Sequence, residues 1–273
     1  MVRWERFKKI LAKTYIYLVL LLMYAPILVL VVYSFTDSDQ LGIWNGFSFK
    51  LYVDLFKNES LVDAFGNTLL IAVVSGIVST ILGTLGAIGV FYSEKRFRQP
   101  VETMTQLPVV NAEIVMALSL AILFKVLNTR YSFLTLLVGH LVLTVAFVYL
   151  NVKPKLMQMD PFIYEAALDL GASPRYALFK VVLPEILPGI FSGFLISLTL
   201  SLDDFVITQY LKEPSFETVS TYIQKIVAKH PIPPEVRALS TILFVIVLVF
   251  VLAITFYNNN KAIKLLKARR GRR

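Results

Sequence analysis

Three acidic residues stand inside long apolar stretches of this sequence. Asp203 and Asp204 come near the end of the apolar run 186–208, and Glu113 lies in the run 107–127. A carboxylate at the centre of a bilayer costs about 2.5–3.5 kcal/mol on insertion scales, so such a group normally faces a cavity or a partner. The pattern predicts that at least one of the two aspartates lines a substrate path, with Glu113 as a further acidic site.

An alternative reading of the aspartate pair stays open. The run can end at Leu202, which leaves both carboxylates at the wet interface or capping a helix. Neighbouring residues of a helix point about 100° apart, so the two side chains need not share a role. We expect one of them to face the path and the other to lie at the interface or bond to a neighbouring helix.

Residues for enzymatic chemistry are missing from this chain. The sequence contains neither a G-x-x-x-x-G-K-[ST] phosphate-binding loop nor an H-E-x-x-H metal motif. It has no cysteine, which excludes disulfides and thiolate catalysis. Of the two histidines, His140 and His230, the first stands among apolar residues, where a neutral, hydrogen-bonded packing role is the usual one. The sequence therefore predicts a chain that is not an enzyme and binds no metal.

Composition places these residues in a membrane protein. Of the 273 residues, 57% are hydrophobic and only 16% are charged, and the mean hydropathy is +0.70. A soluble domain seldom combines so little charge with so much apolar content. The net charge of +9 fits basic loops that face anionic lipid headgroups better than a nucleic-acid surface.

Six apolar runs are each close to the roughly 20 residues that a spanning helix needs. A backbone in lipid must satisfy its own hydrogen bonds, so each run is expected to be helical. The prediction is an all-α integral membrane protein with six transmembrane helices, forming a single permease domain over 1–273. The runs cover residues 15–35, 68–92, 107–127, 133–149, 186–208 and 238–256. The first resembles a signal peptide, but it is long and lacks a small-x-small cleavage site, so we interpret it as an uncleaved span.

The distribution of lysine and arginine predicts the orientation. With the N-terminus inside, 19 of the 27 basic residues fall on the cytoplasmic side, including those of the basic tail 261–273. Cytoplasmic loops carry an excess of Lys and Arg, so both termini are expected in the cytoplasm. Lys125, at the outer end of the third run, is expected to be an interfacial anchor.

The loop 151–185 is the longest cytoplasmic segment between spans. Asp160, followed by Pro161, is typical of a helix start, and so is Ser173, followed by Pro174. Gly171 stands between them, where a left-handed residue closes a helix. We predict two short helices at an angle, the second ending before Pro184, with a surface of small residues at Ala166, Ala167, Gly171 and Ala172. From the residues alone, a contact surface for a soluble partner and a loop packed on its own bundle are equally favoured.

This loop resembles the EAA motif of type I ABC-importer permeases. The spacing of Glu-Ala-Ala, Gly and Leu-Pro matches that motif, and Val181 in place of Ile is the only departure. The resemblance implies the type I permease architecture and a coupling helix that docks in a groove of an ATPase subunit. The residues to which it assigns this coupling are Glu165, Ala166, Ala167, Gly171, Leu183 and Pro184.

Segments elsewhere are similar to the second permease subunit of spermidine/putrescine importers, the PotC type. They are residues 113–117, 197–208, 214–218 and 234–241. Glu113 departs from the Asp that is frequent in that family, and Ala146 stands near a common Pro, which puts a kink there in doubt. Polyamines carry ammonium groups on apolar methylene spacers, so a path of separated carboxylates suits them.

The resemblance implies a permease that imports polyamines across the cell membrane. Its expected partners are an ABC ATPase dimer, a sister permease, an extracytoplasmic polyamine-binding protein and membrane lipid, without nucleic acid. ATP and Mg would be bound by the ATPase, and this chain is expected to bind no cofactor. An ABC permease for an amino acid, sulfate or ferric ion is the alternative, and an ion channel or intramembrane enzyme is a third possibility.

Overall fold

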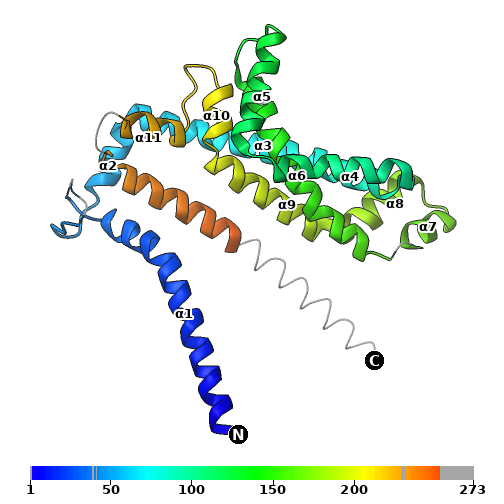
Figure 1. Ribbon diagram of the computed structural model, residues 1–273, viewed down its shortest axis with the longest axis horizontal. Helices are drawn as coiled ribbons and strands as arrows, with labels where there is room; N and C mark the ends of the chain where they lie inside the picture. The colour runs from blue at the N-terminus through cyan, green and yellow to red at the C-terminus, as the bar shows by residue number, and fades with distance from the viewer. Residues whose placement is uncertain (1, 39, 41, 161, 229–231, 253–273) are drawn as a thin grey trace. The chain divides into compact units, whose positions relative to one another are not determined.

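The computed structural model describes residues 2–38, 40, 42–160, 162–228 and 232–252, and most of these residues are helical (Figure 1). An isolated bridge between Thr36 and Phe47 is the only strand-like pairing in those ranges. The predicted all-α fold class is therefore confirmed. The helices are α1 (Val2–Tyr33), α2 (Lys50–Lys57), α3 (Glu59–Phe91), α4 (Lys95–Val110), α5 (Glu113–Val126), α6 (Phe133–Gln158), α7 (Phe162–Asp169), α8 (Pro174–Ala177), α9 (Leu183–Asp203), α10 (Val206–Leu211), α11 (Val219–Val227) and an apolar helix over Val236–Leu252.

The described part of each predicted apolar run is largely helical, but the third run is divided between α4 and α5, and the fifth between α9 and α10, with Asp204 and Phe205 outside both helices. Four helical stretches of the described chain are long and apolar enough to cross a membrane: Leu11–Tyr33, Glu59–Phe91, Phe133–Gln158 and Pro174–Asp203. The bent pair α4 and α5 makes a fifth if it counts as one span. The sixth run forms the helix Val236–Leu252, and its continuation to 256 lies outside the described residues, as does the basic tail 261–273.

The third run is not the single straight span that the sequence predicted. The axes of α4 and α5 differ by 106°. Asn111 and Ala112, between them, have extended backbones with ψ of 147° and 131°. Pro108 stands in the last turn of α4 and has no N–H to donate to the preceding turn, which weakens the helix just before this break.

The second helix of the loop does not end before Pro184, as was predicted. α8 passes through a π-helical turn, Leu178–Val182, directly into α9. The N–H of Leu183 bonds to the carbonyl of Leu178, five residues earlier. Pro184 lacks an N–H and its ring crowds the turn before it, and the wider π turn accommodates both effects. One helix therefore runs from Pro174 to Asp203.

The main core lies where α6 packs against α9 and α3. Val148 of α6 is fully buried there. A Cβ at Gly83 of α3 would come within 2.7 Å of the Val148 Cβ, and one at Gly193 of α9 within 3.1 Å of the Val148 Cα. Small residues at helix contacts let backbones approach closely, which drives helix association in lipid. α6 continues unbroken through Ala146, which is buried.

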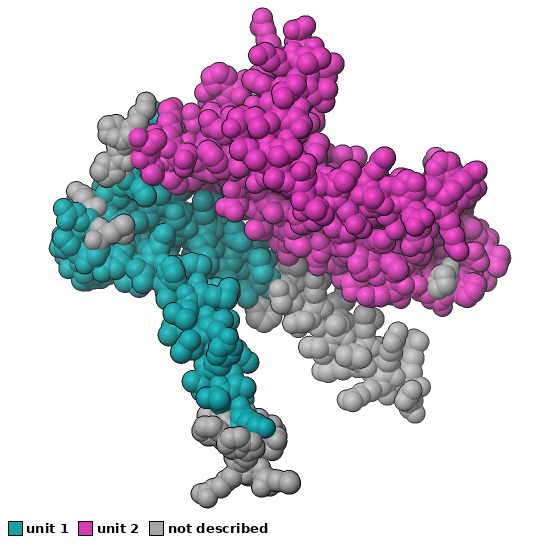
Figure 2. All heavy atoms as spheres, viewed as in Figure 1, with its two compact units in different colours: residues 1–62, 229–252 teal, residues 63–228, 253–273 magenta. Residues whose placement is uncertain are grey.

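The chain divides into two compact units (Figure 2). The first comprises residues 1–62 and 229–252, and the second comprises residues 63–228 together with 253–273. Within the first unit, the buried Arg237 donates hydrogen bonds to the carbonyls of Ser38 at 2.8 Å and Tyr33 at 3.4 Å. It thus links the last residue of α1 to the helix Val236–Leu252. The prediction of a single permease domain stays a prediction.

Candidate substrate path and coupling loop

Asp204 lies at the break between α9 and α10. Its carboxylate accepts hydrogen bonds from the backbone N–H of Ile207 at 3.1 Å and of Thr208 at 2.8 Å, and from the Thr208 hydroxyl at 2.5 Å. These bonds satisfy donors at the start of α10, and the residue is buried. Of the two aspartates, Asp204 is therefore the one that bonds to a neighbouring helix.

Asp203 has a different environment, although it is the adjacent residue. It is the last residue of α9 and is exposed. A negative charge at a helix C-terminus faces the negative end of the helix dipole, so this position does not stabilise α9. Asp203 is thus the exposed residue of the pair, and Asp204 is the buried one.

Glu113 joins these two residues in space. It is the first residue of α5, beyond the bend after α4, and it is half-buried. Its electrostatic neighbours are Asp204 and Asp203. The structure therefore brings together all three acidic residues that the sequence singled out, from the start of α5 and the end of α9.

His140 of α6 lies beside this acidic group and is buried, with hydrogen-bonding partners on both ring nitrogens, which confirms the predicted hydrogen-bonded environment. Its Nδ1 is 2.8 Å from the Ser201 hydroxyl, and its Nε2 is 3.1 Å from the Thr208 hydroxyl and 3.4 Å from the Asp204 carboxylate. The sequence reasoning missed Ser201 and Thr208. The sequence signal that could have identified them is the presence of Ser and Thr side chains at intervals within the apolar runs. Among the described residues, no group of three or more His, Asp or Glu is arranged to hold a metal ion.

The first turn of α11 is bonded to this break and to α3. The Ser220 hydroxyl donates to the Asp204 carbonyl at 2.7 Å, and the Val219 N–H donates to the Thr68 hydroxyl of α3 at 2.8 Å.

Glu217, two residues before α11, pairs with Lys225 at 3.1 Å and with Lys212 at 3.4 Å. Burial raises the pKa of Glu217, but the hydrogen bond and charge of Lys225 and the charge of Lys212 outweigh it and leave that pKa below 4.5.

The coupling loop folds largely as its local signals predicted. The Asp160 side chain accepts from the N–H of Phe162 at 3.0 Å and caps α7, while Pro161 lies outside the described residues. Ser173 caps α8 by accepting from the N–H of Tyr176 at 3.3 Å. Gly171 has a φ of +85°, and α7 ends in a Schellman motif with the bonds Gly171 N–H to Leu168 carbonyl and Ala172 N–H to Ala167 carbonyl.

The outer surface of this loop is open. Glu165, Ala166 and Gly171 are exposed, and Leu170 is 88% exposed. A hollow of about 530 Å³ is lined by Ala167, Leu170, Gly171, Ala172, Ser173 and Tyr176. It contains three of the four predicted small residues; Ala166 is exposed but does not line it. Leu183 and Pro184 lie apart from this hollow, where the π turn enters α9.

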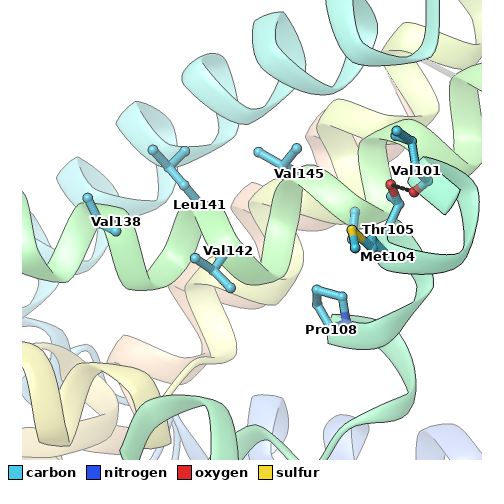
Figure 3. A pocket seen from close by; sticks show the side chains of 9 residues that line it. Val101, Met104, Thr105, Pro108, Val138, Leu141, Val142 and Val145 are labelled. Carbon is cyan, nitrogen blue, oxygen red and sulfur yellow. Dashed lines mark hydrogen bonds between the residues drawn. The ribbon is translucent and has the colours of Figure 1, made fainter. Parts of the chain in front are cut away.

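A second pocket, of about 430 Å³, lies between α4 and α6 (Figure 3). Its lining is almost wholly apolar: Val101, Met104, Thr105, Pro108, Val138, Leu141, Val142, Val145 and Ala146. The hydroxyl of Thr105 donates to the carbonyl of Val101 at 2.8 Å, so it is satisfied within its own helix. No charged side chain lines this pocket, so it offers nothing to a cationic solute.

Comparison with protein families identifies the class of this membrane protein. The family described as binding-protein-dependent transport system inner membrane component matches residues 79–265. This chain belongs to that family. It is a transport permease, and neither the family nor its relatives are enzymes. The match includes the coupling loop and the acidic break.

Relatives of this permease include the spermidine/putrescine transport system permease protein PotC of Escherichia coli (strain K12). The two are 38% identical over 232 residues, which is 85% of this chain and 87% of that protein. PotC of Haemophilus influenzae is 36% identical over 254 residues, or 92% of this chain and 98% of its own length. The putrescine transport system permease protein PotI of Escherichia coli (strain K12) is 34% identical, covering 81% of each chain.

Solved structures confirm the fold of a type I ABC-importer permease. A chain from the crystal structure of a bacterial ABC transporter involved in the import of the acidic polysaccharide alginate gives a TM-score of 0.72. The two chains are 21% identical, and the match covers 92% of this permease and 96% of that chain. An amino acid ABC transporter gives a TM-score of 0.58 at 17% identity, covering 76% and 96%.

Proposed function

We infer that this chain is the transmembrane permease subunit of an ABC importer that moves polyamines, spermidine or putrescine, into the cell. The observation that carries this proposal is the meeting of Asp203, Asp204 and Glu113 at the break after α9, in a chain whose relatives are named as spermidine and putrescine permeases. Carboxylates are the groups that ammonium ions prefer.

The arrangement suits a path rather than a tight binding site. Conduction needs entry and release, so a single exposed carboxylate with an acidic neighbour serves better than a closed cage. In this proposal Asp203 pairs transiently with a passing ammonium group, Glu113 adds to the negative potential, and Asp204 fixes the break. The methylene spacers of the polyamine would pass along the apolar helix surfaces around them.

The coupling loop completes the proposal. The hollow beside Gly171 would receive side chains of an ABC ATPase, whose dimer would bind ATP and Mg, while this chain binds no cofactor. Glu165, Ala166, Ala167 and Gly171 would contact the ATPase, and Leu183 and Pro184 would join that contact to α9. A sister permease and an extracytoplasmic polyamine-binding protein would complete the importer.

In the same proposal both termini and the loop 151–185 lie in the cytoplasm, and the segments 36–67 and 209–237 lie outside. The excess of basic residues on one side supports this orientation. It would place the acidic break in the outer part of the membrane, near the binding protein, and the coupling loop near the ATPase.

Uptake of labelled polyamine tests this function. We expect a strain deleted for this gene to lose uptake of radiolabelled spermidine or putrescine, and the intact gene to restore it. Excess unlabelled polyamine should compete, whereas an amino acid, sulfate or ferric citrate should not. Restored uptake of one of those solutes, with no effect on polyamine, would refute the polyamine assignment and leave a permease for another substrate.

A further inference from the structure

A row of buried hydrogen bonds ends on the carboxylate of Asp204, which caps α10. It begins at Ser75 of α3, whose hydroxyl donates to the Ser201 hydroxyl of α9 at 2.9 Å. Ser201 is 2.8 Å from Nδ1 of His140, and Nε2 of the same ring is 3.1 Å from the Thr208 hydroxyl. The Thr208 hydroxyl donates to Asp204. All five residues are buried, so each group depends on these protein partners.

For a neutral His140 ring, counting protons gives the direction of each hydrogen bond in this row. Thr208 has one hydroxyl proton and gives it to Asp204, so toward His140 the Thr208 oxygen is an acceptor. The Nε2 atom must then carry a hydrogen. In a neutral ring Nδ1 is an acceptor, and it takes the proton of Ser201, whose oxygen in turn accepts from Ser75.

We propose that His140 is a positioning residue for the substrate path, held as the neutral Nε2–H tautomer by Ser201. In this role the Nε2–H of His140 donates to the Thr208 hydroxyl, which in turn donates to the Asp204 carboxylate. These two bonds hold α10 against the end of α9 and thereby fix the direction of the Asp203 side chain. This inference rests on the proposed function of Asp203. His140 itself touches no substrate, because it is buried behind Asp204.

The surrounding contacts explain why the side chain at position 140 needs a hydrogen-bond donor that faces Thr208. The Asp204 carboxylate already accepts from the α10 backbone, and the ring connects that cap to α6. Gly139, the preceding residue, lies against Ile207 and Leu211 of α10, so α6 and α10 are in direct contact here. Without the ring, α10 would keep its apolar contacts and the bond from the Thr135 hydroxyl to the Leu211 carbonyl, but it would lose the bond that joins the Asp204 cap to α6.

The tautomer of His140 can be measured directly. Selective ¹⁵N-histidine labelling of the complete transporter in lipid nanodiscs labels the histidines of every subunit, and the imidazole signal set that is missing from the His140→Gln transporter belongs to His140. We expect His140 to show a protonated Nε2 and an unprotonated Nδ1. A doubly protonated ring or the Nδ1–H tautomer would overturn the proposed direction of the row. This measurement uses the native residue, so it does not depend on how any variant folds.

Uptake by paired variants tests the positioning role. His140→Met keeps the volume and removes both polar atoms, and we expect polyamine uptake to fall by about tenfold, in line with leaving buried partners unsatisfied. His140→Gln keeps an N–H donor near the Nε2 position and should restore most of the uptake. His140→Asn carries its donor nearer the Nδ1 position and should not.

A double-mutant cycle separates this role from general packing. If His140 acts through Asp203, His140→Met should cost less than about twofold in an Asp203→Asn background, because coupled residues are not additive. A tenfold loss that persists in that background would refute the positioning role. If Asp203→Asn alone transports like the parent, the proposed function of Asp203 fails, whatever the tautomer of His140 is.

Discussion

Two adjacent carboxylates meet opposite electrostatic environments in this protein. Asp203 stands at the C-terminus of α9, where the helix dipole opposes a negative charge by about 0.3–1 kcal/mol. Asp204 stands at the N-terminus of α10, where the N–H groups of Ile207 and Thr208 stabilise it. A residue that destabilises its own helix and is exposed is the stronger candidate for function, whereas its neighbour is part of the structure.

The difference between the two aspartates gives the first prediction. Asp203→Asn should lower polyamine uptake by about tenfold without loss of protein, because an exposed charge contributes little to stability but attracts the ammonium group. Asp204→Asn should reduce the amount of folded protein, because the new amide N–H₂ would face donors of Thr208 and leave buried groups unpaired, at a cost of about 1–3 kcal/mol. Uptake and the yield of purified complex are the two measurements.

Glu113→Gln is the matched control for that prediction. It removes a carboxylate from the same acidic group, but from a half-buried position at the start of α5, so the loss of uptake should be smaller than for Asp203→Asn. Parental uptake in all three variants would reject the acidic path and leave a permease of unknown substrate.

Glu217 gives the second prediction, which concerns pH. Its pKa is lowered in the folded protein, so its ion pairs stabilise the fold above about pH 4.5, and this stability is lost as the pH falls through the lowered pKa. Glu217→Gln should therefore lower the melting temperature of the detergent-purified complex at pH 7. The difference from the parent should vanish on acidification below the folded pKa. An equal difference at every pH would show that the charge of Glu217 is not involved.

Among the elements, the continuous helix Pro174–Asp203 connects the two candidate sites. Its first turn follows Gly171 in the coupling loop, and its last residue is the carboxylate of the proposed path. The π turn keeps this helix unbroken where Pro184 was expected to end it. In the proposed function, a displacement of the loop by the ATPase is therefore carried along one rigid element to Asp203.

The turn between α7 and α8 gives the third prediction. Gly171 has φ +85°, but a Cβ there would meet nothing within 4 Å, so the requirement is one of backbone conformation and not of space. Gly171→Leu should therefore strain the turn and lower uptake several-fold while insertion stays normal. Gly171→Asn should be milder, because Asn tolerates the left-handed region.

Recovery of the ATPase with the affinity-purified permease is the second measurement for this turn. Glu165→Ala, which removes an exposed charge from the same surface, should also weaken that recovery. Parental uptake and parental ATPase recovery in Gly171→Leu and Glu165→Ala together would reject the coupling role of the loop.

For the whole molecule, orientation in the membrane gives the fourth prediction. The native sequence has no cysteine, so each single substitution reports on its own position. Ser215→Cys, exposed in the segment before α11, and Ser48→Cys, which is half-buried, should react with an impermeant maleimide added to intact cells. Ser173→Cys, exposed in the coupling loop, should react only after the cells are opened. Labelling of Ser173→Cys in intact cells would reverse the proposed topology.

The class of the fold and the position of the coupling loop could be predicted from the sequence alone. Apolar runs of spanning length are helical in lipid because no other conformation satisfies their backbone, so composition was sufficient. The start of α7, the cap of α8 by Ser173 and the left-handed turn at Gly171 follow from residues within a few positions of each other. The spacing of the loop motif identified the family for the same reason, since it lies within one short segment.

Tertiary structure alone decided which carboxylate is exposed and where the helices break. The bend at Asn111 and Ala112 and the π turn before Pro184 are backbone adjustments that the apolar pattern does not record. Asp203 and Asp204 have identical side chains, and only the break between α9 and α10 gives them different environments. The ring that connects this break to α6, His140, comes from 64 positions earlier in the chain than Asp204. Such contacts depend on how α3, α6, α9 and α10 pack, and local residue preferences contain no information about that packing.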